Sequence, residues 1–140
     1  MISRHLHRRR VQFYETDAAG IVHFSWYFRY MEEAEHAMWR AAGLSIAPPG
    51  APIGWARVSA SCEYFQPLRF EDEVDVRIHI TAITRKTIEY ACELRLGDAT
   101  VARAAMSIIC VRTIPGEPLK AADIPDDIVA RFGVAAEGPA

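Results

Sequence analysis

The segment SWYFRYMEEAEHAMWRAAG, Ser25–Gly43, carries the clearest structural signal in the chain. Ser25 is suited to cap the start of a helix, and Gly43 stands where a left-handed residue would end it. Trp26, Phe28, Trp39 and Ala42 extend the apolar surface beyond one stripe, so we expect this helix to be buried on most sides. The residues at helical spacing are Tyr27, Tyr30, Met31, Ala34, Ala37, Met38 and Ala41.

Strand-like runs follow this helix. A loop rich in proline and glycine, 45–54, separates it from the first run, in which Val58, Ala60, Cys62 and Tyr64 are expected to face the core. Two further runs alternate in the same way, and a fourth is apolar on both faces. The four runs cover 58–64, 74–80, 88–96 and 100–111.

Short connections between these runs favour antiparallel pairing. Gly97–Asp98 is typical of a tight hairpin turn, and Thr84–Lys86 forms another short connection. We also predict a short strand at Val11–Tyr14 and a short helix within Asp123–Phe132, with Pro125 in its first turn. One helix followed by strands predicts the α+β class, with a sheet curled around the helix.

The composition is that of an ordinary globular domain. The chain has 140 residues, of which 51% are hydrophobic and 24% are charged, and its net charge is −2. This charge gives no reason to expect a nucleic-acid partner. We predict a single domain over 1–140, with a core from about 10 to 125, a basic lead-in at 1–9 and a tail at 133–140.

Neither a leader nor a membrane span is expected. The basic stretch RHLHRRR, Arg4–Arg10, is not followed by the apolar region of a signal peptide, and no run is long enough to cross a bilayer. Cys62, Cys92 and Cys110 are odd in number and lack C-x-x-C spacing. We interpret them as reduced core residues of a cytoplasmic protein. We also expect no metal and no cofactor, because no ligand spacing and no phosphate-binding glycine loop occurs.

One acidic residue stands out next to the predicted helix. In YETDAAGIVHFSWYFRY, Tyr14–Tyr30, Asp17 lies in a loop of small residues just before the aromatic start of the helix. It is either a solvated loop residue or a functional carboxylate. Aspartate side chains are ionised at neutral pH, so such a residue could act as a nucleophile or as a general base.

These residues resemble a known family. YETDAAGIVHFSWYFRYMEEA, 14–34, is similar to the signature of hotdog-fold acyl-CoA thioesterases, in the 4-hydroxybenzoyl-CoA thioesterase-like branch that includes the Tol–Pal-associated enzymes. VSASCEYFQPLRFEDEVDVRIHI, 58–80, and AAMSIICVRT, 104–113, resemble later strands of the same family. The resemblance implies a hotdog fold, in which a five- or six-stranded antiparallel sheet wraps one long central helix. It also implies homodimers or homotetramers with active sites at subunit interfaces.

The resemblance also implies roles for individual residues. Asp17 matches the catalytic carboxylate that hydrolyses an acyl-CoA thioester, and Gly20 allows the backbone to approach the thioester. The backbone N–H groups near Phe24 and Ser25, at the helix start, would hold the oxyanion. His23 is either a packed, hydrogen-bonded residue or part of the site.

The remaining candidates are charged side chains. Glu32 matches the acidic position of the motif and either forms a surface ion pair, with Arg29 among its neighbours, or orients the site. Arg85, Lys86 and Arg112 are candidates for contacting the CoA nucleotide, which is part of the substrate; their alternative is to be solvated cations.

Two other functions stay open from the sequence. A hotdog-fold hydroxyacyl-thioester dehydratase would pair His23 with Glu32, and a non-catalytic acyl-thioester-binding protein would need no carboxylate at Asp17. The sequence does not distinguish aromatic from short- or medium-chain aliphatic acyl groups, CoA from acyl carrier protein, or a dimer from a tetramer.

Overall fold

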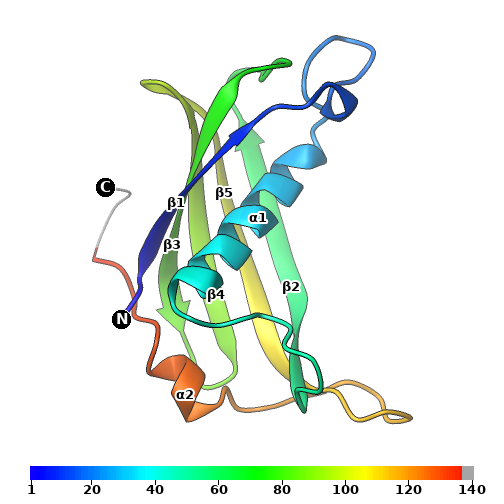
Figure 1. The fold of residues 1–140 in the computed structure, drawn as a ribbon, viewed down its shortest axis with the longest axis vertical. Helices are drawn as coiled ribbons and strands as arrows, with labels where there is room; N and C mark the ends of the chain where they lie inside the picture. The colour runs from blue at the N-terminus through cyan, green and yellow to red at the C-terminus, as the bar shows by residue number, and fades with distance from the viewer. Residues whose placement is uncertain (137–140) are drawn as a thin grey trace.

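A computed structural model describes residues 1–136 as an antiparallel sheet curled around one long helix (Figure 1). The predicted α+β hotdog fold is therefore confirmed. Residues 137–140, the end of the predicted tail, lie outside the described part. The helical elements are a 3-10 turn at Phe13–Glu15, α1 at Trp26–Ala41 and α2 at Asp126–Val129. The strands are β1 Arg4–Arg10, β2 Ile53–Tyr64, β3 Glu73–Ile83, β4 Thr87–Leu96, β5 Ala99–Arg112 and β6 Lys120–Ala121.

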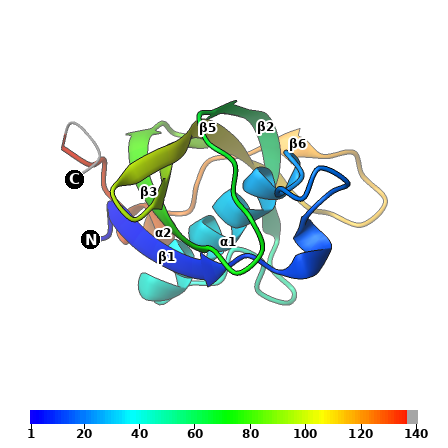
Figure 2. The same ribbon diagram turned by 90° about the horizontal axis from the view of Figure 1, so that it is seen from above.

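The strand order leaves β1 and β2 at the two edges of the sheet. The order is β1-β3-β4-β5-β2, with β6 pairing beside the end of β5. Seen from above, the sheet bends around α1 (Figure 2). The loop that follows β1 and leads into α1 lies at one end of the molecule, and the β3–β4 connection lies at the other (Figure 1).

Helix α1 forms as its periodicity predicts and packs against the concave face of the sheet. Ser25 occupies the N-cap position, although its side chain makes no capping hydrogen bond, and Gly43 has a φ of +78° after the helix end. Trp39 is 1% exposed, and its Nε1–H donates to the Tyr90 hydroxyl at 3.0 Å. This bond ties α1 to β4 in the middle of the core.

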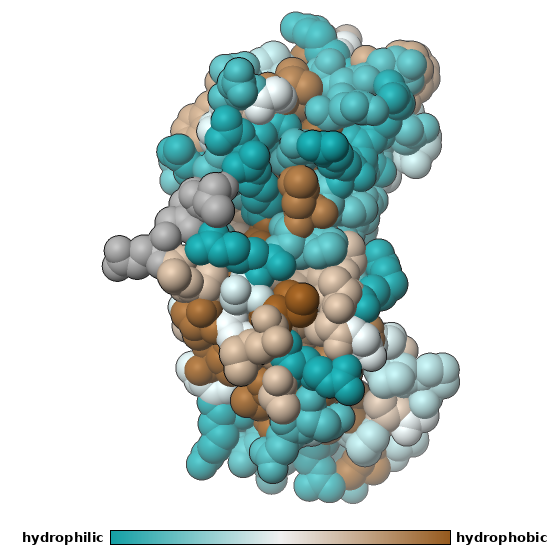
Figure 3. All heavy atoms as spheres, turned by 60° about the vertical axis from the view of Figure 1, so that its left-hand side comes forward, coloured by the Kyte–Doolittle hydropathy of each residue, from teal (hydrophilic) through white to brown (hydrophobic). Residues whose placement is uncertain are grey.

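The prediction for the N-terminus was wrong. The strand is the basic stretch Arg4–Arg10 itself, paired with β3, while Phe13–Glu15 is a 3-10 turn. Every second residue of β1 points inward, and two of these polar side chains, His7 and Arg9, pair with Glu33 of α1. Hydrophobic patterning cannot detect a strand whose inner face is polar. Hydrophilic residues cover much of this side of the molecule in Figure 3.

A β-bulge in β2 corrects the predicted inward face of this strand. The pairing with β5 shifts between Arg57 and Ser59, so Val58 is the extra residue, and it is 56% exposed. Before the bulge, Trp55 packs on Trp39 and Arg57 reaches Glu35. After it, Ala60 and Tyr64 lie on the side of α1, as predicted, but both are exposed and not part of the core. The bulge shifts the alternation by one residue, as bulges do.

The C-terminal segment braces the opposite end of α1 from the loop. Helix α2 is shorter than the predicted helix, and Pro125 is its N-cap, not a first-turn residue. Phe132 packs its ring on Trp39 at 5.0 Å between centroids, and Arg131 donates to the Ala42 carbonyl at 2.7 Å. Within residues 1–136, no helix combines the length and the apolar character that crossing a bilayer demands.

Candidate active site

Residues 15–23 form a narrow, closed loop that presents Asp17. The Asp17 N–H donates to the Ile21 carbonyl at 2.9 Å, and at the base of the loop the His23 N–H donates to the Glu15 carbonyl at 2.9 Å. Gly20 turns the chain at a φ of +77°, which glycine adopts without strain. Its N–H donates to the Asp17 carbonyl at 2.9 Å. The loop is therefore a compact hairpin with a defined shape.

The Asp17 side chain is exposed and oriented by the loop. Its Oδ1 accepts a hydrogen bond from the Ala19 N–H at 2.9 Å. None of the contacts described for residues 1–136 occupies its Oδ2. A carboxylate held in this way has a fixed direction and one oxygen available for an incoming group. The predicted functional carboxylate is thus accessible to a substrate.

The start of α1 lies at the base of the same loop and supplies backbone donors. The Trp26 N–H donates to the His23 carbonyl at 3.0 Å, whereas none of the backbone hydrogen bonds described for residues 1–136 uses the Phe24 N–H. The Tyr64 hydroxyl donates to the Phe24 carbonyl at 3.0 Å and fixes that peptide from β2. A free N–H at a helix N-terminus favours negative charge. The arrangement can hold an oxyanion near Phe24.

His23 takes the hydrogen-bonded of its two alternatives. Its Nδ1 lies 2.8 Å from the Ser25 hydroxyl and 3.3 Å from the Ser25 N–H, so it caps the helix start. Glu32 lies further along α1 and is paired with Arg29 at 3.7 Å and Arg57 at 3.9 Å. No contact described for residues 1–136 joins His23 to Glu32, the pair that a dehydratase would need.

Two hollows flank the helix start. One, of about 370 Å³, has walls from the loop, from α1 and from the end of β2: Ile21, Val22, Phe24, Tyr27, Tyr64, Phe65, Gln66 and Pro67. The other, also about 370 Å³, lies between α1 and β2: Ser25, Phe28, Arg29, Met31, Glu32, Arg57, Ala60 and Met106. The first is largely lined by apolar side chains, as a binding site for an acyl group would be, whereas apolar and polar side chains share the lining of the second. Asp17 lines neither of them in a single protomer.

The predicted CoA-binding cations lie at the other end of the molecule. Arg85 and Lys86 are in the β3–β4 connection, where both pair with Asp123, at 3.1 Å and 3.6 Å. Arg112 ends β5 near the same end. Strand β3 has 11 residues between the two ends, which corresponds to roughly 35 Å at the usual rise per residue. One protomer therefore does not bring these cations to Asp17.

A buried ion pair joins α1 to β2, and the sequence patterns did not predict it. Glu35 is 0% exposed and accepts two hydrogen bonds from Arg57, from Nη2 at 2.8 Å and from Nη1 at 3.1 Å. Glu35 lies one turn after Met31, within the buried part of α1. A charged residue in an apolar helix face is the signal that could have revealed this pair.

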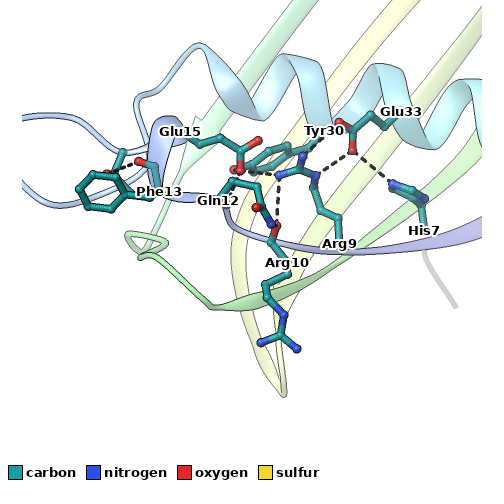
Figure 4. A network of polar contacts seen from close by, with 9 residues as sticks. His7, Arg9, Arg10, Gln12, Phe13, Glu15, Tyr30 and Glu33 are labelled. Atoms are coloured by element: carbon teal, nitrogen blue, oxygen red, sulfur yellow. Dashed lines mark hydrogen bonds and ion pairs between the residues drawn. The ribbon is translucent and has the colours of Figure 1, made fainter.

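A second buried carboxylate, Glu15, lies two residues before Asp17. Figure 4 shows its contacts with Arg9 of β1 and Tyr30 of α1, and the link from Arg9 onward to Glu33. Arg9 donates to Glu15 at 2.5 Å and to Glu33 at 2.8 Å. No local pattern indicates a role for Glu15, because Arg9 and Tyr30 belong to other elements of the fold.

The three cysteines lack the properties of a nucleophile. Burial raises the pKa of the Cys62 thiol and also the pKa of the Cys110 thiol. Cys92 is 4% exposed, and burial raises the pKa of its thiol as well. Catalytic thiols have lowered pKa values, so these cysteines are packing residues, as predicted.

Comparisons with known proteins agree with this geometry. A family model described as the thioesterase superfamily matches residues 19–103. A curated protein of Aquifex aeolicus (strain VF5), named as an esterase, is 39% identical over 102 residues, which are 71% of this chain and 78% of that protein. The acyl-CoA thioester hydrolase YbgC of Escherichia coli O6:H1 is 25% identical over 125 residues, or 88% of this chain and 91% of that protein.

A solved structure supports the same relationship. The crystal structure of a hypothetical protein from Aquifex aeolicus matches with a TM-score of 0.84 and 34% identity, covering 91% of this chain and 98% of that chain. With more than half of its residues matched by the family model, the chain belongs to the thioesterase superfamily.

Proposed function

We propose that this member of the thioesterase superfamily hydrolyses an acyl-CoA thioester to the free acid and CoA, with Asp17 as the reacting carboxylate. The observation that carries the proposal is the position of Asp17 in a closed loop at the start of α1, with one oxygen unoccupied by the described residues. Phe24, which directly follows that loop, offers a backbone N–H at the helix start. Carboxylate and oxyanion donor are the two parts that thioester hydrolysis needs.

Two routes are consistent with this geometry. Asp17 either attacks the thioester carbonyl to give a mixed anhydride, which water then hydrolyses, or it removes a proton from an attacking water. In both routes the carbonyl oxygen becomes an oxyanion that the Phe24 N–H stabilises. Loss of one such donor typically costs about 10²–10³-fold in kcat. The roles of Gly20, His23 and Ser25 are to shape the loop and the helix start around these two groups.

A dimer through the edge of β2 would complete the site. Most residues of β2 from Arg57 onward are exposed. Strand β2 is also an edge of the sheet, which can pair with another strand. Antiparallel pairing of β2 with its copy reverses the partner. The end of the partner that carries Arg85, Lys86 and Arg112 would then approach the end that carries Asp17, and these cations could contact the CoA phosphates. A pair of such dimers would give the homotetramer.

The substrate is proposed only as a class. The hollow between α1 and β2 begins at Ser25, beside the proposed reaction centre, and can take an aromatic or a short aliphatic acyl group. We place the enzyme in the cytoplasm, where acyl-CoA and acyl carrier protein thioesters are both present. Glu32 and Arg57 line this hollow, so polar acyl groups are included in the test.

A thiol-release assay tests the proposal directly. Purified wild type and Asp17→Asn are compared on aromatic, aliphatic and polar acyl-CoAs and on an acyl carrier protein thioester. We expect at least one thioester to be hydrolysed, and the variant to lose about 10²-fold or more in kcat because a positioned base contributes about 10²–10⁴-fold. Asp98→Asn, an exposed aspartate in the β4–β5 turn, is the matched control and should keep full activity.

The same assay separates the alternatives. A wild type that is inert on every thioester, or a folded Asp17→Asn variant with full activity, would reject the proposed reaction. Hydration of crotonyl-CoA would instead indicate a dehydratase, and tight CoA binding without turnover would indicate a binding protein. Neither alternative has an observation in its favour among the contacts of residues 1–136.

A further inference from the structure

We propose that Glu15 is a positioning residue for Asp17: its buried carboxylate anchors the base of the loop and thereby sets where the reacting carboxylate lies. The inference rests on the proposed function of Asp17. Glu15 itself is buried behind the loop and touches no reacting atom.

The contacts of Glu15 join three elements at one carboxylate oxygen. Oε1 accepts from Arg9 Nη1 at 2.5 Å, from the Gln12 N–H at 2.8 Å and from the Tyr30 hydroxyl at 2.9 Å. These donors belong to β1, to the start of the 3-10 turn and to α1 (Figure 4). The side chain of Glu15 is therefore held from three directions.

The backbone of Glu15 closes the loop that carries Asp17. Its carbonyl accepts the His23 N–H at 2.9 Å, and the next residue, Thr16, forms a bridge with Val22. The backbone of Glu15 therefore joins the two ends of the loop. Any shift of Glu15 moves the two strands of the hairpin together, and Asp17 lies only two residues beyond it.

The energetics of this contact indicate a role in geometry. Glu15 is 0% exposed, and its Oε2 has no hydrogen-bond partner among the described residues. A buried ion pair is a poor device for stability, because apolar residues of similar volume often serve as well or better. Buried ionic groups can instead specify one arrangement of the chain, and here the arrangement they specify is the base of the proposed catalytic loop.

The donors around Glu15 keep their protons across the physiological range. Burial, and then the hydrogen bond to Glu15, raises the pKa of Tyr30 well above its usual value. Burial opposes the charge on Arg9, but its hydrogen bonds to Glu15 and Glu33 raise the pKa of the guanidinium overall. Both groups therefore remain hydrogen-bond donors to Glu15 at neutral pH.

The structure offers a matched control on the same arginine. Glu33 also pairs with Arg9, at 2.8 Å from Nε, but it lies on α1 and makes no described contact with the loop at 15–23. Removing Glu33 weakens the same ion-pair network without releasing the loop. A larger loss of kcat in a Glu15 variant than in a Glu33 variant would show an effect of the loop. An equal loss in both would show an effect of the ion-pair network alone.

The experiment is a double-mutant cycle in the thiol-release assay. Glu15→Ala is expected to lower kcat by about 10–100-fold with KM changed by less than about 3-fold, because a misplacement of about 1 Å can cost about 10²-fold. Glu33→Ala should change kcat by less than about 3-fold. Glu15→Gln keeps an acceptor oxygen at the same place and should recover most of the lost kcat. In the Asp17→Asn background, Glu15→Ala should cost nothing further, since it acts through Asp17.

Each other outcome overturns the inference. A folded Glu15→Ala variant with the kcat of Glu33→Ala, or one whose loss is equally large in the Asp17→Asn background, would show that Glu15 does not act through Asp17. Full activity of Asp17→Asn alone would reject the proposed function and this inference together. Should Glu15→Ala fail to fold, Tyr30→Phe removes one of the three donors and takes its place in the cycle; a loss of kcat below about 2-fold in that variant would likewise reject the inference.

Discussion

Replacing Arg57 by methionine should be among the most destabilising single changes in the chain. Glu35 is 0% exposed and has both oxygens bonded to Arg57, so the variant leaves a buried carboxylate without its counter-charge. Breaking a buried pair from one side costs about 3–5 kcal/mol. Arg57 is 30% exposed, which places the expected loss at the lower end, about 3 kcal/mol, or a fall in Tm of about 10 °C.

Thermal and urea unfolding of four proteins test this prediction. Wild type and Arg57→Met are compared with Glu35→Met and with the double variant, which removes both charges and should recover most of the stability. An Arg57→Met variant as stable as wild type, or a double variant less stable than Arg57→Met, would refute the reasoning.

Four further predictions follow from particular residues. Val58→Lys should weaken the proposed dimer, because it places a charge on the exposed edge of β2; light scattering would show more monomer. Gly20→Val should cost about 1–3 kcal/mol by thermal unfolding and lower kcat, because a β-branched residue is strained at a φ of +77°. No atom lies within 4 Å of the added Cβ, so the expected cost comes from the backbone and not from a clash. Burial raises the pKa of Cys62, so its alkylation should be slow at neutral pH and accelerate only in alkaline solution. Burial and the neighbouring Cys62 raise the pKa of Tyr64 to about 12, so near-UV absorbance of wild type minus Tyr64→Phe should show this phenol ionising near that pH, and a transition near 10 would contradict the structure.

The parts of the fold that sequence could predict are those stabilised by apolar patterning. Helix α1 has apolar residues at helical spacing, β3 and β4 alternate in hydrophobicity, and β5 is a continuous apolar run; all four lie where these patterns indicate. Strand β1 was not predicted, because its inward residues are histidine and arginine. The burial of His7 and Arg9 depends on their acidic partner on α1, Glu33. Such a strand is specified by pairs of residues distant in sequence, and no local pattern contains that information.

The site divides in the same way. Asp17, Gly20 and the helix start form a contiguous motif, so a resemblance to a family could identify them together. Glu15 and Glu35 have partners on other elements, and only the fold places those partners beside them. The cations proposed for CoA lie at the opposite end of the protomer from Asp17, so they could meet it only in the proposed dimer, which no local pattern of one chain describes.

The bulge at Val58 divides β2 into two parts whose inward and outward positions alternate independently. Because the alternation shifts there, the inward residues Arg57 and Ala60 are separated by three positions, an odd spacing that a regular strand does not allow for one face. If the same 12 residues of β2 formed a regular strand without the bulge, and Ala60 kept its inward position, the position of Arg57 would turn to the outer face. Glu35 would then lose its partner, so a homologue with a regular β2 of this length should carry an uncharged residue at that position of the helix.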